Sequence, residues 1–246
     1  MENVNNSYFD GYYKDIWKSI IPGELTVKEI EFILSYFNLQ PGNKILDLMC
    51  GYGRHTLALA RKGIEVTAID NLNDYINEVS EIAKAEHLPV KAIKADVIDY
   101  NTGELFKLAL CMGNSLNFFS EQETSRLLSS IYNQLEKGGH LLIHTWSLAE
   151  IAIKQFTEKS WSNIDGMKYL ADAKYLFDPA RIETETTIIL PDGTTETKMA
   201  IDYIFSVAEM TSMLAKTGFV VKEFYSIPGR KKFKIGDPRA YIVAIK

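Results

Sequence analysis

Cysteine, positive charge and long apolar runs are all scarce in this sequence. Its 246 residues include two cysteines, Cys50 and Cys111, which cannot form a disulfide framework. No stretch approaches the roughly 18 consecutive apolar residues of a membrane-spanning helix. Lysine and arginine total 27 against 32 acidic residues, a formal net charge of -5, so the chain lacks the basic field of a general nucleic-acid binder. These absences favour a small-molecule partner over a membrane or a nucleic acid.

The beginning of the chain, MENVNNSYFDGYYKDIW, also lacks the basic end and apolar core of a signal peptide. We therefore expect a soluble, cytoplasmic protein, whose oligomeric state these features leave open. With 246 residues, 46% of them hydrophobic, the chain is long enough for one α/β domain and a small insertion.

Apolar runs and helical repeats alternate along the first 150 residues. The apolar runs predict strands at 44–49, 64–69, 90–95, 107–112 and 140–145, and helical spacing predicts helices at 25–38, 54–62, 72–86 and 121–135. Strands separated by helices of this length pair in parallel through right-handed crossovers. The predicted fold is an open α/β sheet that binds ligands at the carboxyl ends of its strands.

From residue 150 the pattern changes to runs suited to antiparallel strands, at 167–177, 181–190 and 194–205. A helix at 206–218 and two further strands follow, the last of them expected to be antiparallel. We therefore divide the chain into an N-terminal segment (1–40), an α/β domain (41–149 and 206–246) and an antiparallel insertion (150–205).

The stretch Ile45 to Thr56 has the form of a ligand cradle. An apolar run closes with Asp47, glycines at 51 and 53 form a tight turn, and a helix begins near Arg54. Such a turn lets a ligand approach the main chain, and the N–H groups of the helix start can hold a polar or anionic group. The dinucleotide fingerprint would need glycine at position 56, and a phosphate-binding loop would need Gly-Lys-Ser/Thr.

Asp70 ends the second predicted strand, 17 positions after Gly53 (70 minus 53). At this distance from the turn, an acid can reach the vicinal hydroxyls of a ribose. The alternative is an N-cap for the helix that begins near Leu72.

Three stretches resemble the class I S-adenosylmethionine-dependent methyltransferases. Asp47, Gly51 and Gly53 match motif I, Asp-x-Gly-x-Gly-x-Gly, with Met49 where the first glycine usually stands. CMGNSLNFF (111–119) resembles the Asn-Ser-Leu-x-Tyr/Phe-Phe run of a branch acting mostly on small molecules, and LEKGG (135–139) resembles the turn before the fifth strand. The resemblance covers about residues 40 to 146.

The resemblance implies a seven-stranded, Rossmann-like methyltransferase sheet with helices on both faces. It implies S-adenosylmethionine as cofactor, S-adenosylhomocysteine as product, and in-line methyl transfer to a small-molecule acceptor. Asp47 would orient the amino group of the cofactor, and Asp96 with Val97 would bracket the adenine. The full expected cofactor set is Asp47, Met49, Gly51, Gly53, Arg54, Asp70, Leu72, Asp96, Val97, Met112, Asn114, Asn117 and Tyr13.

Aromatic residues crowd positions 7 to 20, at spacings that can share one helical face. They indicate either a segment packed on the sheet or, as the resemblance implies, a lid over the cofactor and substrate. The resemblance also implies that the insertion forms a three-stranded cover over the active site. The expected substrate contacts are Tyr8, Tyr12, Phe118, Trp146, Arg181 and Tyr203, although a surface strand position is an alternative for Arg181.

His144 ends the fifth predicted strand, beside the expected reaction centre. An imidazole there can accept a proton from the acceptor or orient it, so we assign His144 as the candidate catalytic residue. A buried structural histidine is the alternative. We expect no metal site, because Cys50, Cys111, His55 and His144 match no established zinc spacing.

Three other functions stay open. The basic loop from Arg230 to Arg239 would suit a methyltransferase acting on RNA or protein, or it is a solvated turn. An NAD-dependent oxidoreductase shares the fold and Asp70. A non-catalytic cofactor-binding module is the third, because Met49 departs from motif I.

Overall fold

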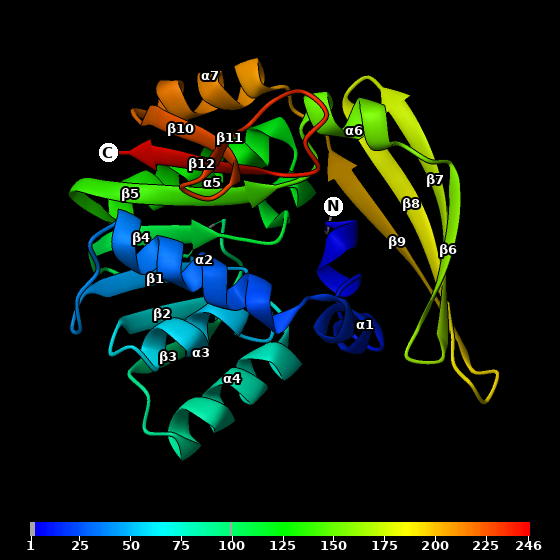
Figure 1. The fold of residues 1–246 in the computed structure, drawn as a ribbon, viewed down its shortest axis with the longest axis horizontal. Helices are drawn as coiled ribbons and strands as arrows, with labels where there is room; N and C mark the ends of the chain where they lie inside the picture. The colour runs from blue at the N-terminus through cyan, green and yellow to red at the C-terminus, as the bar shows by residue number, and fades with distance from the viewer. Residues whose placement is uncertain (1–2, 99) are drawn as a thin grey trace.

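Two sheets of different kinds make up the structure, a computed structural model that describes residues 3–98 and 100–246 (Figure 1). The first two residues of the expected N-terminal segment lie outside this described part. The larger sheet has eight strands, in the spatial order β11 (Lys231–Lys232), β10 (Val220–Ile227), β12 (Ala240–Ile245), β5 (Leu135–Thr145), β4 (Phe106–Cys111), β1 (Lys44–Leu48), β2 (Glu65–Asp70) and β3 (Val90–Lys94).

Strands β1 to β5 are all parallel, and β12 is antiparallel to both β5 and β10. The predicted α/β fold is therefore confirmed, including its antiparallel last strand. The sheet has one strand more than the seven expected, because the two-residue strand β11 pairs with β10. The strand order reverses between β1 and β4, and such a switch point leaves a crevice at the carboxyl ends of the strands.

Helices cover both faces of this sheet. One face carries α2 (Gly23–Tyr36), α3 (Arg54–Ala60) and α4 (Asn73–Ala85), and the other carries α5 (Glu121–Gln134), α6 (Ala149–Gln155) and α7 (Val207–Thr217). Along β1, Ile45 packs against α2 and the next residue, Leu46, packs against α5. Covering both faces explains why these strands are apolar at successive positions.

The smaller sheet is antiparallel and has four strands, β6 (Lys159–Ile164), β7 (Met167–Phe177), β8 (Ala180–Ile189) and β9 (Thr195–Tyr203). The prediction of three strands was wrong, because it missed β6. Almost every residue of β6 is exposed, so its sequence KSWSNI has no apolar alternation to reveal it. We call this sheet the cover sheet.

Residues 3–20, the first half of the expected N-terminal segment, are dark blue in Figure 1 and lie between the two sheets. From here on the name N-terminal segment refers to these residues, because the rest of the segment forms α2 on the large sheet. It consists of a short 3-10 helix, η1 (Val4–Ser7), and the helix α1 (Tyr13–Ile20). The aromatic residues do not share one helix as expected, because the chain turns at Gly11, which has a φ of +64°. Asn5 joins this segment to β9 by donating to the carbonyl oxygen of Ile201 (2.9 Å) and accepting from its N–H (2.8 Å).

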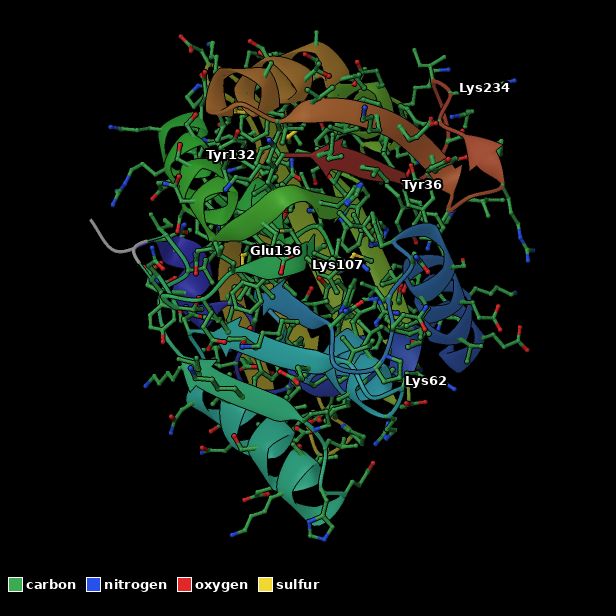
Figure 2. The ribbon with its side chains drawn as sticks, turned by 90° about the vertical axis from the view of Figure 1, so that its left-hand side faces the viewer. Tyr36, Lys62, Lys107, Tyr132, Glu136 and Lys234 are labelled. Atoms are coloured by element: carbon green, nitrogen blue, oxygen red, sulfur yellow. The ribbon has the colours of Figure 1, made fainter. Side chains whose placement is uncertain are left out.

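The amino ends of the parallel strands, opposite the crevice, carry ordinary surface groups. Figure 2 shows Lys62, Lys107 and Glu136 at this end, near the beginnings of β2, β4 and β5. Lys107 donates to the carbonyl oxygen of Asn38 (2.7 Å). In the described part of the chain, no helix is both long and apolar enough to cross a membrane.

Candidate functional site

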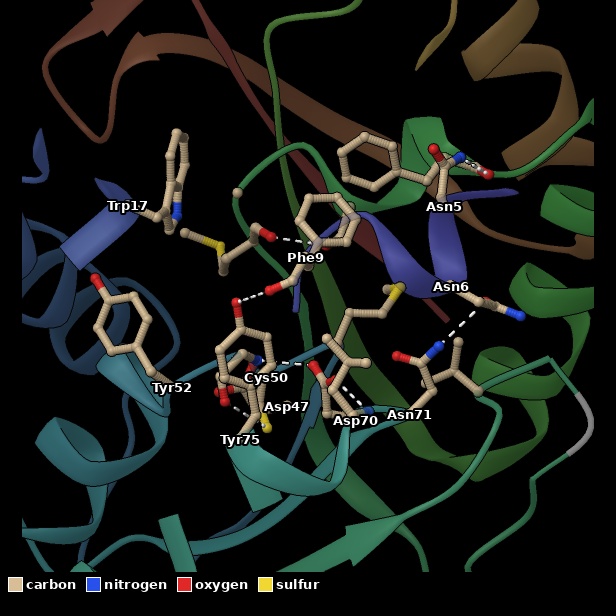
Figure 3. A pocket seen from close by; sticks show the side chains of 18 of the residues that line it. Asn5, Asn6, Phe9, Trp17, Asp47, Cys50, Tyr52, Asp70, Asn71 and Tyr75 are labelled. Atoms are coloured by element: carbon tan, nitrogen blue, oxygen red, sulfur yellow. Dashed lines mark hydrogen bonds between the residues drawn. The ribbon is translucent and has the colours of Figure 1, made fainter. Parts of the chain in front are cut away.

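A cavity of about 1080 Å³, its mouth included, lies at the carboxyl ends of β1, β2 and β4. Pockets for small molecules and cofactors commonly lie at such a switch point of an α/β sheet. Figure 3 shows Asp47, Cys50 and Asp70 facing this space, with Phe9 and Trp17 on the side of the N-terminal segment.

Most of the expected cofactor residues lie around this cavity. Ten of the thirteen line it, namely Tyr13, Asp47, Met49, Gly51, Arg54, Asp70, Leu72, Asp96, Val97 and Met112. The other three, Gly53, Asn114 and Asn117, are not among the described residues that line the cavity. Phe118 is the one expected substrate residue that does.

The turn after β1 forms the floor of the cavity. Gly51 donates its N–H to Oδ2 of Asp70 (2.9 Å), and Asp47 accepts a hydrogen bond from the hydroxyl of Thr56 (2.6 Å). A Cβ at Gly51 would meet no atom within 4 Å, so the space above it is left for a ligand. A Cβ at Gly53 would lie 2.6 Å from Cγ2 of Val79, so that glycine lets α3 and α4 pack closely.

Both carboxylate oxygens of Asp70 accept backbone N–H groups. Oδ1 accepts the N–H of Leu72 (3.0 Å) at the start of α4, and Oδ2 accepts the N–H of Gly51. Each carboxylate oxygen has two lone pairs, so Asp70 keeps acceptor capacity for ribose hydroxyls.

The cavity is acidic. Asp47, Asp70 and Asp96 line it, and burial raises the pKa of both Asp47 and Asp70. The lining arginine, Arg54, is already paired with the buried Glu29 (2.5 Å). This environment suits a ligand that carries positive charge, such as a sulfonium and an ammonium group, and disfavours a pyrophosphate.

Glu29 was missed by the sequence analysis. It lies on α2, is buried, and accepts hydrogen bonds from Arg54 (2.5 Å), from Nε2 of His55 (3.0 Å) and from the hydroxyl of Tyr241 (2.6 Å). Although burial opposes it, these partners hold the pKa of Glu29 well below its usual range. The network fixes Arg54 at the start of α3. Glu29 lies within a helical repeat of the sequence, and that position gave no signal of this role.

The N-terminal segment closes one side of the cavity. Asn3, Asn5, Asn6, Phe9, Tyr13 and Trp17 line it. Two hydrogen bonds hold the segment to the β2 side, one from the hydroxyl of Tyr75 to the carbonyl oxygen of Phe9 (2.8 Å) and one from Asn71 to Asn6 (3.1 Å). The segment therefore packs against the β2 side of the large sheet and also lines the cavity, so its position is compatible with both alternatives for its aromatic residues.

Comparison with known proteins agrees with this geometry. A family model described as a methyltransferase domain matches residues 45–139. The glycine/sarcosine N-methyltransferase of Aphanothece halophytica is 23% identical over 181 residues, which are 72% of this chain and 68% of that protein. Residues 45–139 therefore form a methyltransferase domain, and these likenesses support the class I S-adenosylmethionine-dependent methyltransferase superfamily.

Solved methyltransferase structures share the whole fold. A crystal structure of an S-adenosylmethionine-dependent methyltransferase from Clostridium acetobutylicum ATCC 824 matches with a TM-score of 0.82 and 16% identity, over 95% of each chain. An amino pentose methyltransferase from Micromonospora echinaspora matches with a TM-score of 0.74 and 15% identity, over 96% of this chain and 97% of that one. At these identities the likeness shows the shared fold, while the match to the methyltransferase domain supports S-adenosylmethionine as the cofactor.

Asn114 and Asn117 have a structural role in this methyltransferase. Both are fully buried. Asn114 accepts the N–H groups of Trp146 (2.9 Å) and Ser147 (3.1 Å), and Asn117 donates to the carbonyl oxygen of Tyr203 (2.8 Å). They tie the ends of β4 and β5 to β9, so their expected contact with the cofactor receives no support from their positions.

His144 is a buried, neutral imidazole. Burial lowers its pKa to about 3, and its ring stacks on Tyr241 at 4.3 Å. Nδ1 accepts the N–H of Gly113 (3.4 Å), which places the ring proton on Nε2, and Nε2 has no partner among the described residues. The general-base role stays a prediction, and this environment disfavours it.

The other expected substrate residues lie outside the cavity lining. Tyr8 bonds the hydroxyl of Thr186 (2.9 Å) in the cover sheet, and the N–H of Tyr12 donates to Glu196 (3.2 Å). The ring of Trp146 lies 5.5 Å from that of Trp17, next to the cavity. The two strand residues point elsewhere, since Arg181 pairs with Glu183 (2.8 Å) and Tyr203 lines a separate groove beside α5 and α7.

No group of three or more metal-ligating side chains occurs in the described ranges.

The sequence analysis missed Phe9, Tyr52, Asn71 and Tyr75, which all line the cavity. Their positions in turns and at helix starts carry no motif, and only the aromatic density near Phe9 gave a signal.

Proposed function

We propose that this methyltransferase transfers a methyl group to a small-molecule acceptor. The N-terminal segment carries the proposal, because its residues Asn3, Asn5, Asn6, Phe9, Tyr13 and Trp17 line one side of the cavity and narrow the access of a folded polymer. The amino pentose and glycine/sarcosine enzymes, which the chain resembles, are named for small acceptors.

The cavity residues fit the cofactor. Gly51 leaves room for the methionine part, Asp47 would orient its amino group, and Asp70 and Asp96 would hold the ribose and the adenine. Bound S-adenosylmethionine supplies an electrophilic methyl group on a sulfonium. The protein then has to align the acceptor, exclude water and take up a proton.

The basic loop does not favour an RNA acceptor. Lys231 pairs with Asp237 and Lys232 pairs with Glu223, so two of its cations are already neutralised. This arrangement supports the solvated-turn alternative.

Calorimetric titration with S-adenosylmethionine, S-adenosylhomocysteine and NAD in parallel tests the cofactor site. We expect the two adenosyl ligands to bind and NAD not to bind. Replacing Asp70 with Ala should weaken their binding by about 1–3 kcal/mol, because a buried charge-assisted hydrogen bond is lost. Unchanged affinity in this variant would remove the ribose assignment.

Incubation of a cell extract with cofactor labelled on its methyl group tests the acceptor class. We expect label in the fraction that passes a small-pore filter. Label retained with RNA or protein would overturn the small-molecule proposal without affecting the cofactor assignment.

A further inference from the structure

The carboxylate of Asp202, near the end of β9, links the cover sheet to the parallel sheet. Its Oδ1 accepts hydrogen bonds from Nδ2 of Asn114 (2.7 Å) and from the hydroxyl of Ser147 (3.2 Å). Asn114 follows β4 and Ser147 follows β5, so Asp202 lies at the carboxyl ends of both strands. Met112 and Gly113, immediately before Asn114, line the cofactor cavity.

The orientation of the Asn114 amide is determined by its neighbours. Its oxygen accepts two backbone N–H groups, so its nitrogen must be the atom that donates to Asp202. Asp202 therefore uses one oxygen for structure. The other oxygen, Oδ2, receives no hydrogen bond from any residue in the described ranges, and the side chain is partly exposed.

The surroundings of Asp202 contain acceptors and aromatic rings rather than a counter-ion. Burial raises the pKa of both Tyr8 and Tyr13, whose rings lie 4.8 Å apart, and the charge of Asp202 contributes to the same shift. The ring of Tyr13 lines the cofactor cavity and stacks on Trp17 at 6.0 Å. The carboxylate thus lies close to the aromatic wall of the cavity.

The lysine on the same strand is already paired. Lys198 of β9 pairs with Asp10 and with Glu196 (3.2 Å). Among the described residues, Asp202 forms no ion pair. A carboxylate with one fixed oxygen, one free oxygen and no counter-ion is a receptor for a cationic donor.

We propose that Asp202 binds the protonated nitrogen of the acceptor and takes its proton, so that the acceptor is a small cationic amine. This inference rests on the proposed function and adds the acceptor atom. The aromatic faces of Tyr13 and Trp17 favour the same charge through cation–π attraction.

The proton balance of this step is simple. The acceptor ammonium gives one proton to Oδ2 of Asp202, which leaves a lone pair on nitrogen. That lone pair forms the nitrogen–carbon bond to the methyl group while the carbon–sulfur bond breaks, and its electron pair stays on sulfur. The methylated amine keeps one positive charge, and Asp202 later releases its proton to solvent.

The protonation behaviour of Asp202 is suited to this role. Burial raises its pKa to about 6, so the carboxyl group can accept a proton and release it near neutral pH. The ionisable groups that interact with its charge are the hydroxyls of Tyr8 and Tyr13, and the hydroxyl of Tyr169 contacts that of Tyr8. The polar groups from β4 and β5, Asn114 and Ser147, do not titrate.

A binding measurement tests the proposal without any acceptor. Sinefungin carries a protonated amine where S-adenosylmethionine carries its methyl group, and S-adenosylhomocysteine carries neither. We expect the preference for sinefungin over S-adenosylhomocysteine to fall about tenfold in Asp202→Asn, because a charge-assisted hydrogen bond is lost. The affinity for S-adenosylhomocysteine should stay unchanged, which also shows that the variant is folded.

Asp172→Asn is the matched control, because Asp172 is an exposed carboxylate on β7 of the same sheet. We expect its ligand preference to equal that of the wild type. Asp202→Glu should restore part of the preference, since it restores the charge. An unchanged preference in Asp202→Asn would overturn the proposal.

An activity measurement then compares matched acceptors. Glycine, ethanolamine and glucosamine are the amine probes, and glycolate, ethylene glycol and glucose are their hydroxyl counterparts. We expect transfer to amines alone, with kcat/KM at least tenfold lower in Asp202→Asn and without the fall in rate below pH 6. Transfer to the hydroxyl counterparts would overturn the proposal, and if no probe reacts, the ligand preference decides. Failure to bind S-adenosylhomocysteine would instead reject the proposed function.

Discussion

The two sides of the active site are assembled by contacts of very different sequence separation. On the cofactor side, Asp47 contacts Thr56 and Gly51 contacts Asp70, which are separations of 9 and 19 residues. On the acceptor side, Asn5 bonds Ile201 and Asn114 bonds Asp202, separations of 196 and 88 residues. The cofactor side is a local structure, and the acceptor side exists only when distant segments meet.

This difference has a consequence for how each side responds to change. A local βαβ unit pays little loop-closure entropy, whereas long-range contacts form only after that entropy has been overcome. We therefore expect changes on the cofactor side to separate cleanly into effects on packing and effects on binding. Changes on the acceptor side should alter stability and acceptor handling together.

The largest expected effect belongs to the glycines of the cofactor turn. Gly53→Ala should lower the free energy of unfolding by about 3 kcal/mol, because the new Cβ would meet Val79 and a positive φ is strained for alanine. Gly51→Ala should lower it by only about 1 kcal/mol, the strain alone, while cofactor affinity falls tenfold or more. Urea denaturation and calorimetry measure the two quantities.

If both glycine variants lose stability equally and bind the cofactor equally, Gly51 does not face the ligand. Gly53 as a packing residue and Gly51 as a binding residue would then no longer be distinguishable.

On the acceptor side, Asn5→Ala should lower the free energy of unfolding by about 2 kcal/mol. The buried Asn5 side chain bonds Phe118 once and Ile201 twice, and its loss leaves backbone groups unpaired. Limited proteolysis should show faster cleavage of the N-terminal segment, and thermal unfolding measures the stability. Wild-type proteolysis rates in this variant would mean that Asn5 does not hold the segment in place.

Asp202 should make stability depend on pH. Its pKa is raised from 3.8 to about 6 in the folded protein, so folding favours its protonated form. This contribution is present below about pH 4 and is lost as the pH rises through 6. Asp202→Asn cannot ionise, so its stability relative to the wild type should increase by about 1–2 kcal/mol between pH 4 and pH 7.5. A constant difference across this range, measured by urea denaturation, would show that Asp202 is not perturbed.

Met49→Gly should have the smallest effect. Met49 has a φ of +54°, which explains why the superfamily usually has glycine there, but its side chain also packs against the core. Relief of strain and loss of packing should nearly cancel, leaving stability within about 1 kcal/mol of the wild type. Cofactor affinity, measured by calorimetry, should stay within threefold. A tenfold gain would show that Met49 obstructs the cofactor.

The sequence predicted the fold and the convergence of most of the expected cofactor residues on one cavity, for related reasons. Apolar runs with helical segments between them require a parallel sheet, and its carboxyl edge collects the residues that follow β1, β2 and β3. Asp47, Asp70 and Asp96 each follow or end one of these strands, so their convergence was predictable. The strand β6 could not be predicted, because an exposed strand needs no apolar alternation.

The acceptor side could not be predicted in the same way. Asn114 lies in a recognisable run, yet its buried amide serves the ends of β5 and β9 rather than the cofactor cavity. His144 is a candidate base by position, and only burial lowers its pKa to about 3. Glu29 is one acid in an ordinary amphipathic helix until Arg54, His55 and Tyr241 surround it.

The sequence by itself determined the α/β class, the position of the cofactor turn and the acids that follow its strands. These features depend on periodicity and on backbone conformations that a few residues impose locally. The tertiary structure alone decided which glycine has open space above it, which asparagines are buried in hydrogen-bond networks, and that Asp202 bonds Asn114 through one oxygen. Those properties depend on burial and on partners far away in the chain, and no local pattern encodes either.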